Sequence, residues 1–119
     1  MIVKAINKYI RVSPYKLRPI IDVIRGSSVK KALFWLKVNQ GRRSIPVLKT
    51  ILSAYANAKN LHKSDVASDN FIIKEIRVDQ GPSVTYFKPG AMGRANMQQK
   101  KMCHVMVGLD FVKNKTRIT

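Results

Sequence analysis

The sequence predicts an α+β fold from which a long β-hairpin protrudes. Apolar residues recur at helical spacing three times within residues 14–61. Segments rich in β-branched residues lie at 2–12, 71–79 and 103–109, and each favours a strand. The last two strands are separated by a stretch without Leu, Ile or a helical pattern, which predicts that the two strands and this stretch form a long hairpin. At 119 residues, one domain is expected.

The first strand and helix are predicted from residues 2–26. Isoleucines alternate with lysines over residues 2–12, which favours a strand. Ser13-Pro14 is typical of a helix start, because serine can cap free amides and proline has no amide to satisfy. Gly26 ends this helix, and Pro19 within it is expected to kink or loosen the first turns. One apolar face, at helical spacing, is formed by Leu17, Ile20, Ile21 and Ile24.

Two further helices are predicted before the middle of the chain. Ser27-Ser28 offers the second helix a cap, and Asn39-Gln40-Gly41 ends it. The third helix begins near Ser44, tolerates Pro46 in its first turn and runs to about Leu61. The apolar stripes of the two helices are formed by Val29, Ala32, Leu33 and Leu36, and by Leu48, Ile51, Leu52 and Tyr55.

The second half of the chain is predicted to contain a loop over 61–70 and the protruding hairpin. Arms that pair up to a tip near 89–93 would each extend about 30 Å, at about 3.3 Å per residue. A compact chain of this length has a radius of gyration of only about 13 to 14 Å. The arms have few apolar residues, and isolated two-stranded hairpins are marginal in water, so the hairpin needs an external wall. We predict a globular unit of residues 1–80 plus 102–110, a hairpin of residues 81–101, and a basic tail of residues 111–119.

The charge of the chain indicates the nature of that wall. Lys and Arg number 23 against 6 Asp and Glu, which gives a net charge of +17. Most of it lies in residues 1–63, where Asp22 is the single acid, and no acid occurs from residue 80 through 109. A polyanionic partner explains this charge most simply, with nucleic acid the first candidate and an anionic membrane surface the second. No apolar run is long enough to cross a membrane, no signal-peptide pattern is present, and a single cysteine excludes a disulfide framework.

Catalytic and metal-binding interpretations are weak. Cys103 and His104 are adjacent, and successive strand residues point to opposite faces, so they cannot form a hydrogen-bonded dyad. His62, Asp65 and Asp69 could ligate a metal, but solvated turn residues are favoured in a segment rich in Ser and Lys. The six scattered acids provide no convincing acid–base pair, and no phosphate-loop or zinc-protease motif occurs. We expect no enzyme activity, no metal and no cofactor.

The basic residues favour binding to phosphate groups. Such contacts would be mostly to the nucleic-acid backbone, which positions a protein without reading sequence. Trp35 could stack on a base, but it lies on an apolar helix, so packing in the core or an interface is favoured. For Tyr86 and Phe87 in the hairpin, stacking on RNA and packing against a partner remain open. A free-standing nucleic-acid regulator and a membrane-surface protein are the competing functions.

Several segments resemble the ribosomal protein L22 family, in the right order and spacing over residues 2–109. The matching segments are Lys8-Tyr9-Ile10-Arg11-Val12-Ser13-Pro14 with Lys16 and Arg18, Ile24-Arg25-Gly26, Ser53-Ala54-Tyr55-Ala56-Asn57-Ala58, Val78-Asp79-Gln80-Gly81-Pro82, Pro89, Gly93-Arg94-Ala95, and Lys100-Lys101 before His104-Val105. The resemblance implies three helices on a small antiparallel sheet with a long hairpin. It also implies a structural protein of the large ribosomal subunit that binds its rRNA, assists assembly and lines the polypeptide exit tunnel with its hairpin tip.

The resemblance and the charge together define the expected binding residues. Expected partners are large-subunit rRNA, neighbouring large-subunit proteins and, at the tip, the nascent polypeptide, with no membrane insertion and no homo-oligomer. The rRNA-binding residues are predicted to be Lys4, Lys8, Arg11, Ser13, Lys16, Arg18, Arg25, Lys30, Arg42, Arg43, Lys49, Lys88, Arg94, Lys100 and Lys101. The tunnel-lining residues of the hairpin are predicted to be Thr85, Tyr86, Gly90, Ala91, Met92, Gly93 and Arg94.

Two features separate this chain from the common family pattern. Thr85-Tyr86 stands where the family commonly has a basic pair, and Gly90, Met92 and Met97 occupy positions that are commonly basic.

The run 42–49 and the Cys103-His104 pair are similar to plastid members, and Lys exceeds Arg 15 to 8, as suits an AT-rich genome. We therefore expect a ribosome of a plastid (chloroplast) rather than of the bacterial cytoplasm.

Overall fold

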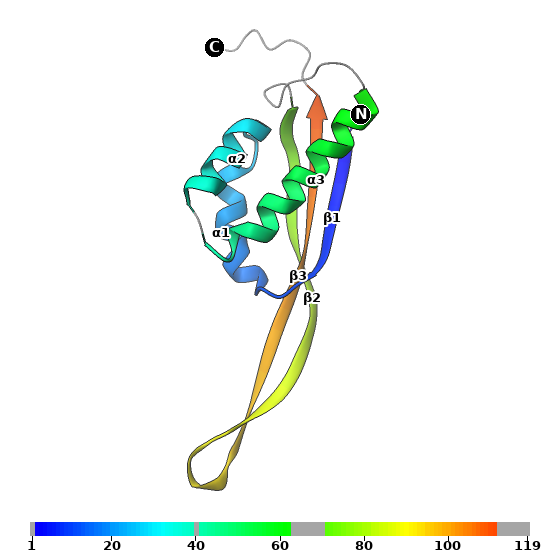
Figure 1. Cartoon of the computed structure of the whole chain (residues 1–119). Helices are drawn as coiled ribbons and strands as arrows, with labels where there is room; N and C mark the ends of the chain where they lie inside the picture. The colour runs from blue at the N-terminus through cyan, green and yellow to red at the C-terminus, as the bar shows by residue number, and fades with distance from the viewer. Residues whose placement is uncertain (1, 40, 63–70, 112–119) are drawn as a thin grey trace.

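Three helices lie across one face of a three-stranded antiparallel sheet, and two of the strands continue beyond it as a hairpin (Figure 1). The computed structural model describes residues 2–39, 41–62 and 71–111. In chain order its elements are β1 (Ile2–Ile10), α1 (Pro14–Ile24), α2 (Val29–Val38), α3 (Ser44–His62), β2 (Phe71–Pro89), a 3-10 turn (Ala91–Gly93) and β3 (Ala95–Phe111). The strand order is β1-β3-β2, so the last strand of the chain is the central one. The predicted α+β fold with a long hairpin is confirmed.

Strand β1 pairs antiparallel with β3, from Ile2 opposite Asp110 to Ile10 opposite Cys103. The register shifts between Asn7 and Ile10, and Tyr9 has a φ of 58°, in the left-handed region that a tyrosine seldom adopts. The backbone N–H of Tyr9 donates to Nδ1 of His104 at 3.0 Å, and the two rings meet edge to face with centroids 5.0 Å apart. This bulge ends the strand at Ile10, two residues before the predicted Val12.

The three helices begin and end close to the predicted residues. Helix α1 starts at Pro14, but the Ser13 side chain accepts no amide hydrogen bond, so the predicted capping role of its hydroxyl is wrong. The helix runs through Pro19 to Ile24. The Ser28 side chain does cap α2, accepting from the Lys31 N–H at 3.3 Å. The predicted third helix is confirmed as α3.

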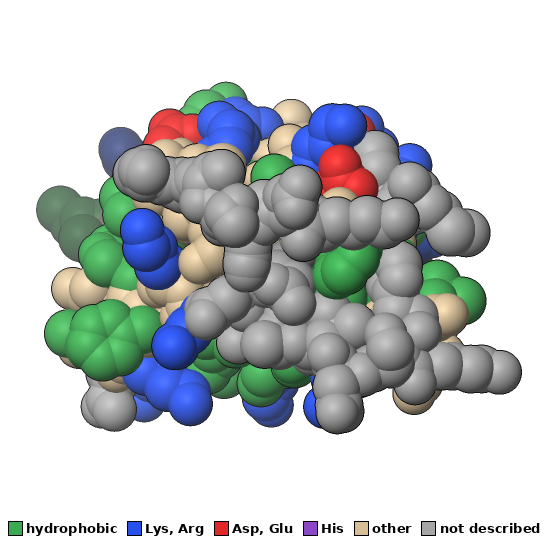
Figure 2. All heavy atoms as spheres, turned by 90° about the horizontal axis from the view of Figure 1, so that it is seen from above, with side chains coloured by type: hydrophobic (Ala, Val, Ile, Leu, Met, Phe, Trp, Pro, Cys, Tyr) green, Lys and Arg blue, Asp and Glu red, His purple; other side chains and the backbone are tan. Residues whose placement is uncertain are grey.

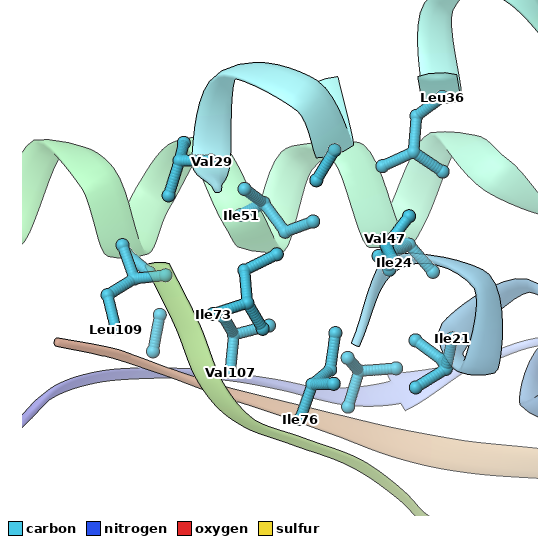
Figure 3. Packing of buried hydrophobic residues seen from close by; sticks show 14 of the residues in the cluster. Ile21, Ile24, Val29, Leu36, Val47, Ile51, Ile73, Ile76, Val107 and Leu109 are labelled. Carbon is cyan, nitrogen blue, oxygen red and sulfur yellow. The ribbon is translucent and has the colours of Figure 1, made fainter. Parts of the chain in front are cut away.

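The core lies between the helices and the sheet. Figure 3 shows side chains from all three helices pointing toward those of β2 and β3. The fully buried residues of the cluster include Leu17, Ile21, Ile24, Val29, Leu36, Val47, Ile51, Phe71, Ile73, Val107 and Leu109. The Phe71 ring packs against Tyr55 and Phe111, with centroids 5.8 and 5.4 Å away. Trp35 is partly buried against this core, in agreement with the packing role predicted for it.

The connection between α1 and α2 closes the outer edge of β2. The Gly26 N–H donates to the Ile73 carbonyl at 3.2 Å, and the Ile73 N–H donates to the Ser27 carbonyl at 2.9 Å. Gly26 has a φ of 81°, which glycine tolerates without steric cost, and it ends α1 as predicted. The Arg25 guanidinium donates to the Ile76 carbonyl at 3.1 Å, three residues further along the same edge of β2.

Beyond the helices, β2 and β3 remain paired out to Pro89 opposite Ala95. The molecule measures 66 × 25 × 16 Å, and its radius of gyration of 17.8 Å exceeds the roughly 13.5 Å of a compact chain of this length. The strands are longer than the predicted 71–79 and 103–109 because the ladder continues where no side chain is buried. Phe111, which was predicted to begin the tail, ends β3. The rest of the predicted tail, and residues 63–70 of the predicted loop, lie outside the described residues.

Candidate nucleic-acid interface

A basic cavity of about 750 Å³ lies at the root of the hairpin. Its volume is within the range of pockets that bind small molecules, about 300 to 1,000 Å³. We call it the hairpin-root cavity; it is lined by Arg11, Val12, Ser13, Lys16, Arg43, Val84, Gln99, Lys100, Lys101 and Met102. Five of these residues are cations, and none is an Asp or Glu among the described residues that line the cavity. The cavity is therefore suited to an anionic ligand.

Four parts of the chain meet at this cavity. The turn after β1 contributes Arg11, and it is tightened by a hydrogen bond from the Val12 N–H to the Ile10 carbonyl at 2.8 Å. The first turn of α1 contributes Lys16, and Arg43 comes from the residues just before α3. The fourth part is the hairpin, where Lys101 pairs with Ser83 and the adjacent Lys100 with Val84.

The charge of the cavity is not offset within the molecule. In the part of the chain that the structure describes, none of the five lining cations forms an ion pair with an acid. Three of the chain's acids pair elsewhere, as Asp22 with Arg25, Asp110 with Lys74, and Asp79 with Arg77, at 2.8, 3.6 and 3.4 Å. Figure 2 looks onto the end of the molecule opposite the hairpin, and acidic side chains are visible there beside basic ones. The hairpin root is thus one place where several uncompensated cations are gathered.

One aromatic residue beside the cavity was missed by the sequence analysis. Tyr15 is 66% exposed, and its ring lies 5.3 Å from the Arg18 guanidinium carbon and 5.4 Å from Nζ of Lys101. Exposed aromatic rings next to cations are typical of surfaces that bind unpaired nucleotides. The available signal was an aromatic residue between basic ones in the first turn of a helix, but its neighbour Lys101 is distant in sequence.

The structure brings together only part of the predicted rRNA-binding set. Six predicted residues line the cavity, namely Arg11, Ser13, Lys16, Arg43, Lys100 and Lys101. Arg18 is adjacent through Tyr15 and also donates to the Val78 carbonyl at 3.4 Å. The others are spread over the surface: Lys4 and Lys8 on β1, Arg25 at the end of α1, Lys30 on α2, Arg42 before α3, Lys49 on α3, and Lys88 and Arg94 on the hairpin.

The residues predicted to line a tunnel occupy two parts of the hairpin. Thr85 and Tyr86 lie in the paired arms, opposite Gln99 and Gln98, and the Tyr86 hydroxyl is 2.8 Å from Oε1 of Gln98. The turn itself is closed by the Gly90 N–H, which donates to the Arg94 carbonyl at 2.6 Å. At its apex Met92 is 95% exposed. Ala91 and Gly93 complete this turn, which carries no charge before Arg94.

Cys103 and His104 occupy opposite faces of β3, as predicted. The Cys103 thiol is buried, and burial raises its pKa, with the positive charge of Arg18 acting in the opposite direction. His104 is half-buried, and its Nδ1 accepts the Tyr9 N–H rather than facing the Cys103 thiol. Among the described residues, no three His, Cys, Asp or Glu side chains are grouped to hold a metal. No helix within the described ranges is both long and apolar enough to span a membrane.

Comparison with known proteins identifies the family. The family model described as "Ribosomal protein L22p/L17e" matches residues 5–110. The chain belongs to the ribosomal protein L22 family. It is therefore a structural constituent of the ribosome and not an enzyme.

Relatives in the L22 family include bacterial and plastid types. The chain is 44% identical to "Large ribosomal subunit protein uL22" of Desulfitobacterium hafniense over 104 residues, covering 87% of this chain and 90% of the relative. It is 43% identical to "Large ribosomal subunit protein uL22c" of Staurastrum punctulatum over 112 residues, covering 94% and 81%. With the uL22 of Trichodesmium erythraeum it shares 40% identity over 107 residues, covering 90% and 88%. Because these identities are similar, they do not separate the two types.

Proposed function

We propose that this protein is a constituent of the large ribosomal subunit that binds large-subunit rRNA through the hairpin-root cavity and the hairpin. The observation that carries the proposal is the gathering of five uncompensated cations where the hairpin leaves the helices. The phosphate groups of RNA are suitable ligands for such a cluster, and binding is favoured because each neutralised phosphate releases counterions. The relatives that are named as large-subunit proteins support the same assignment.

The exposed arms of the hairpin are consistent with this function, because they bury almost no side chains against the rest of the chain. The arms carry no acid, and their side chains are largely exposed, so beyond the sheet they are supported mainly by their pairing with each other. RNA that surrounds the arms would hold them in place, and the hairpin would in turn hold separate RNA segments together during assembly. In this proposal Arg94 and Lys88 contact phosphates along the arms, and neighbouring large-subunit proteins contact the remaining surface.

The hairpin tip is proposed to form part of the wall of the polypeptide exit tunnel. Its apex is uncharged, with Gly90, Ala91, Met92 and Gly93 in sequence, and the Met92 side chain is almost fully exposed. A flexible thioether adapts to varied apolar surfaces, as a wall that meets many passing chains requires. We further propose a plastid ribosome as the site of action, on the strength of the Lys excess and of the run at residues 42–49.

The proposal is tested by removing cations from the hairpin-root cavity. Replacing Arg11, Lys16 and Lys101 together by Ala should weaken binding to large-subunit rRNA. Since each lost phosphate contact contributes about 0.7 to 0.9, the slope of log K against log salt should fall by about 2 to 3. The measurement is a filter-binding titration at several salt concentrations.

The matched control removes the same charge elsewhere. Lys31, Lys37 and Lys59 are exposed and do not line the cavity, so their triple replacement by Ala should change the slope by less than 1. Equal effects of the two triple variants would reject the cavity as the binding site. In low-salt gradients the wild-type chain should sediment with large subunits; a wholly free pool would support the competing role of a regulator acting outside the ribosome.

A further inference from the structure

We propose that Tyr15 is a stacking platform for one unpaired nucleotide, whose flanking phosphates lie in the hairpin-root cavity. The inference rests on the proposed function, because it requires RNA at this cavity, but it adds the form that the RNA takes there. A purely electrostatic surface would accept a regular duplex equally well. The features around Tyr15 favour a nucleotide that is extruded from its helix.

The Tyr15 ring is two-thirds exposed although it lies beside two cations. It follows Pro14, which is buried, and precedes Lys16, which lines the cavity. Its two charged neighbours lie 5.3 and 5.4 Å from the ring centroid, beyond the roughly 3.5 to 4.0 Å at which stacked carbon atoms touch. Neither cation therefore covers the ring as closely as a stacked base would.

The two cations beside Tyr15 are placed to bind the phosphate groups of a nucleotide whose base stacks on the ring. Lys101 reaches from β3 over the ring and also lines the cavity, so a base on Tyr15 would place its phosphate within reach of this ammonium group. The Arg18 guanidinium is anchored by its hydrogen bond to the Val78 carbonyl, and its plane can itself stack on a base or bind a phosphate.

The lining of the cavity contains apolar surface as well as cations. Val12, Val84 and Met102 lie among the basic residues, and such side chains would gain nothing from a phosphate backbone alone. They provide contacts for a ribose or base edge that leaves the duplex. A-form RNA presents unpaired bases at bulges and loops, where aromatic side chains recognise them.

The test compares two short RNA duplexes that differ by a single bulged 2-aminopurine nucleotide. Wild-type protein should bind the bulged RNA about tenfold more tightly than the fully paired RNA, and stacking should quench the fluorescence of the probe. Tyr15→Ala should remove both the preference and the quenching, whereas Tyr15→Phe should keep them because the ring is retained. The salt dependence of binding should be the same in both variants, since tyrosine carries no charge.

A matched control excludes a general effect of losing an exposed ring. Phe34 on α2 is 70% exposed and does not line the cavity, so Phe34→Ala should keep the preference for the bulged RNA. The inference fails if Tyr15→Ala keeps the preference while the triple cation variant loses RNA binding, an outcome that leaves the proposed function intact. If wild-type protein binds neither RNA nor large subunits, the proposed function fails together with the inference. Circular dichroism of each variant confirms that the fold is retained.

Discussion

Strands β2 and β3 each have a packed part and a bare part, although one ladder of backbone hydrogen bonds runs through both. Beside the helices, Phe71, Ile73, Val105 and Val107 are fully buried. From Asp79 to Met102, all of which the structure describes, no side chain is buried. Since a hydrogen bond contributes only about 0.5 to 1.5 kcal/mol net, we expect the buried side chains of the packed part to supply most of the stability that separates the two parts.

The largest expected effect is a difference in stability between variants of two phenylalanines in β2. Phe71→Ala removes a ring that packs against Tyr55 and Phe111, and it should lower the free energy of unfolding by about 3 to 5 kcal/mol. Phe87→Ala removes a ring that is 66% exposed on the hairpin, and it should change this free energy by less than about 0.5 kcal/mol. Urea denaturation followed by circular dichroism measures both. Comparable losses would mean that the hairpin contributes to the core.

The same contrast explains which elements could be predicted from the sequence. The helices were predictable because buried residues recur on one face and because Ser28 and Gly26 mark their limits. The outer parts of β2 and β3 were predicted as the paired arms of a hairpin because they lack a helical pattern, and not from alternation of apolar residues, since alternation reports burial on one face and these arms bury neither. The pairing of β1 with β3 joins the two ends of the chain, and no local pattern specifies it.

A smaller effect is expected at Cys103, which lies where the packed part ends, opposite Gln80 and Ile10. Burial raises the pKa of its thiol in the folded state. Below about pH 8.5 the thiol is protonated in both states; above it, only the unfolded chain ionises, so stability falls as pH rises until the folded pKa is reached. The loss should be at most about 1.4 kcal/mol per pH unit.

Cys103→Ala is the matched comparison, because it lacks the ionisable group while all lysines and tyrosines remain. Urea denaturation at neutral pH and at about pH 9.5 should show a smaller loss of stability in the variant than in the wild type. Parallel pH dependences would indicate that the thiol is open to water and that the packed part ends before β3 reaches this residue.

The candidate site was predictable only in its individual residues. Lys100 and Lys101 were identified from charge and from the family resemblance, as were Arg11 and Lys16. Their meeting with Arg43 depends on how α3 and the hairpin approach the start of α1, which is a property of the tertiary structure. Tyr15 acquires its role through Lys101, and a sequence-local argument could not connect residues so far apart.

The smallest effect is expected from removing most of the hairpin. Deleting Ser83–Gln98 should leave the helices and the packed part of the sheet folded, with a change in unfolding free energy below about 1 kcal/mol, because the deleted side chains bury little apolar surface. Circular dichroism and urea denaturation provide the measurement. If the helices melt out with the hairpin, the two parts of the strands are not independent and the comparison fails.

The pairing of Ile2 with Asp110 also determines when the sheet can form during synthesis. Ribosomes synthesise chains from the N-terminus, and β1 and the three helices are complete long before their central strand exists. Such sequence-distant contacts are slow to form. The hairpin-root cavity needs Arg11 and Lys101 together, so it comes into being only after β3 is made. A partly synthesised chain therefore has positive charge but no assembled cavity, and under the proposed function we expect its full affinity for RNA only after β3 has been made.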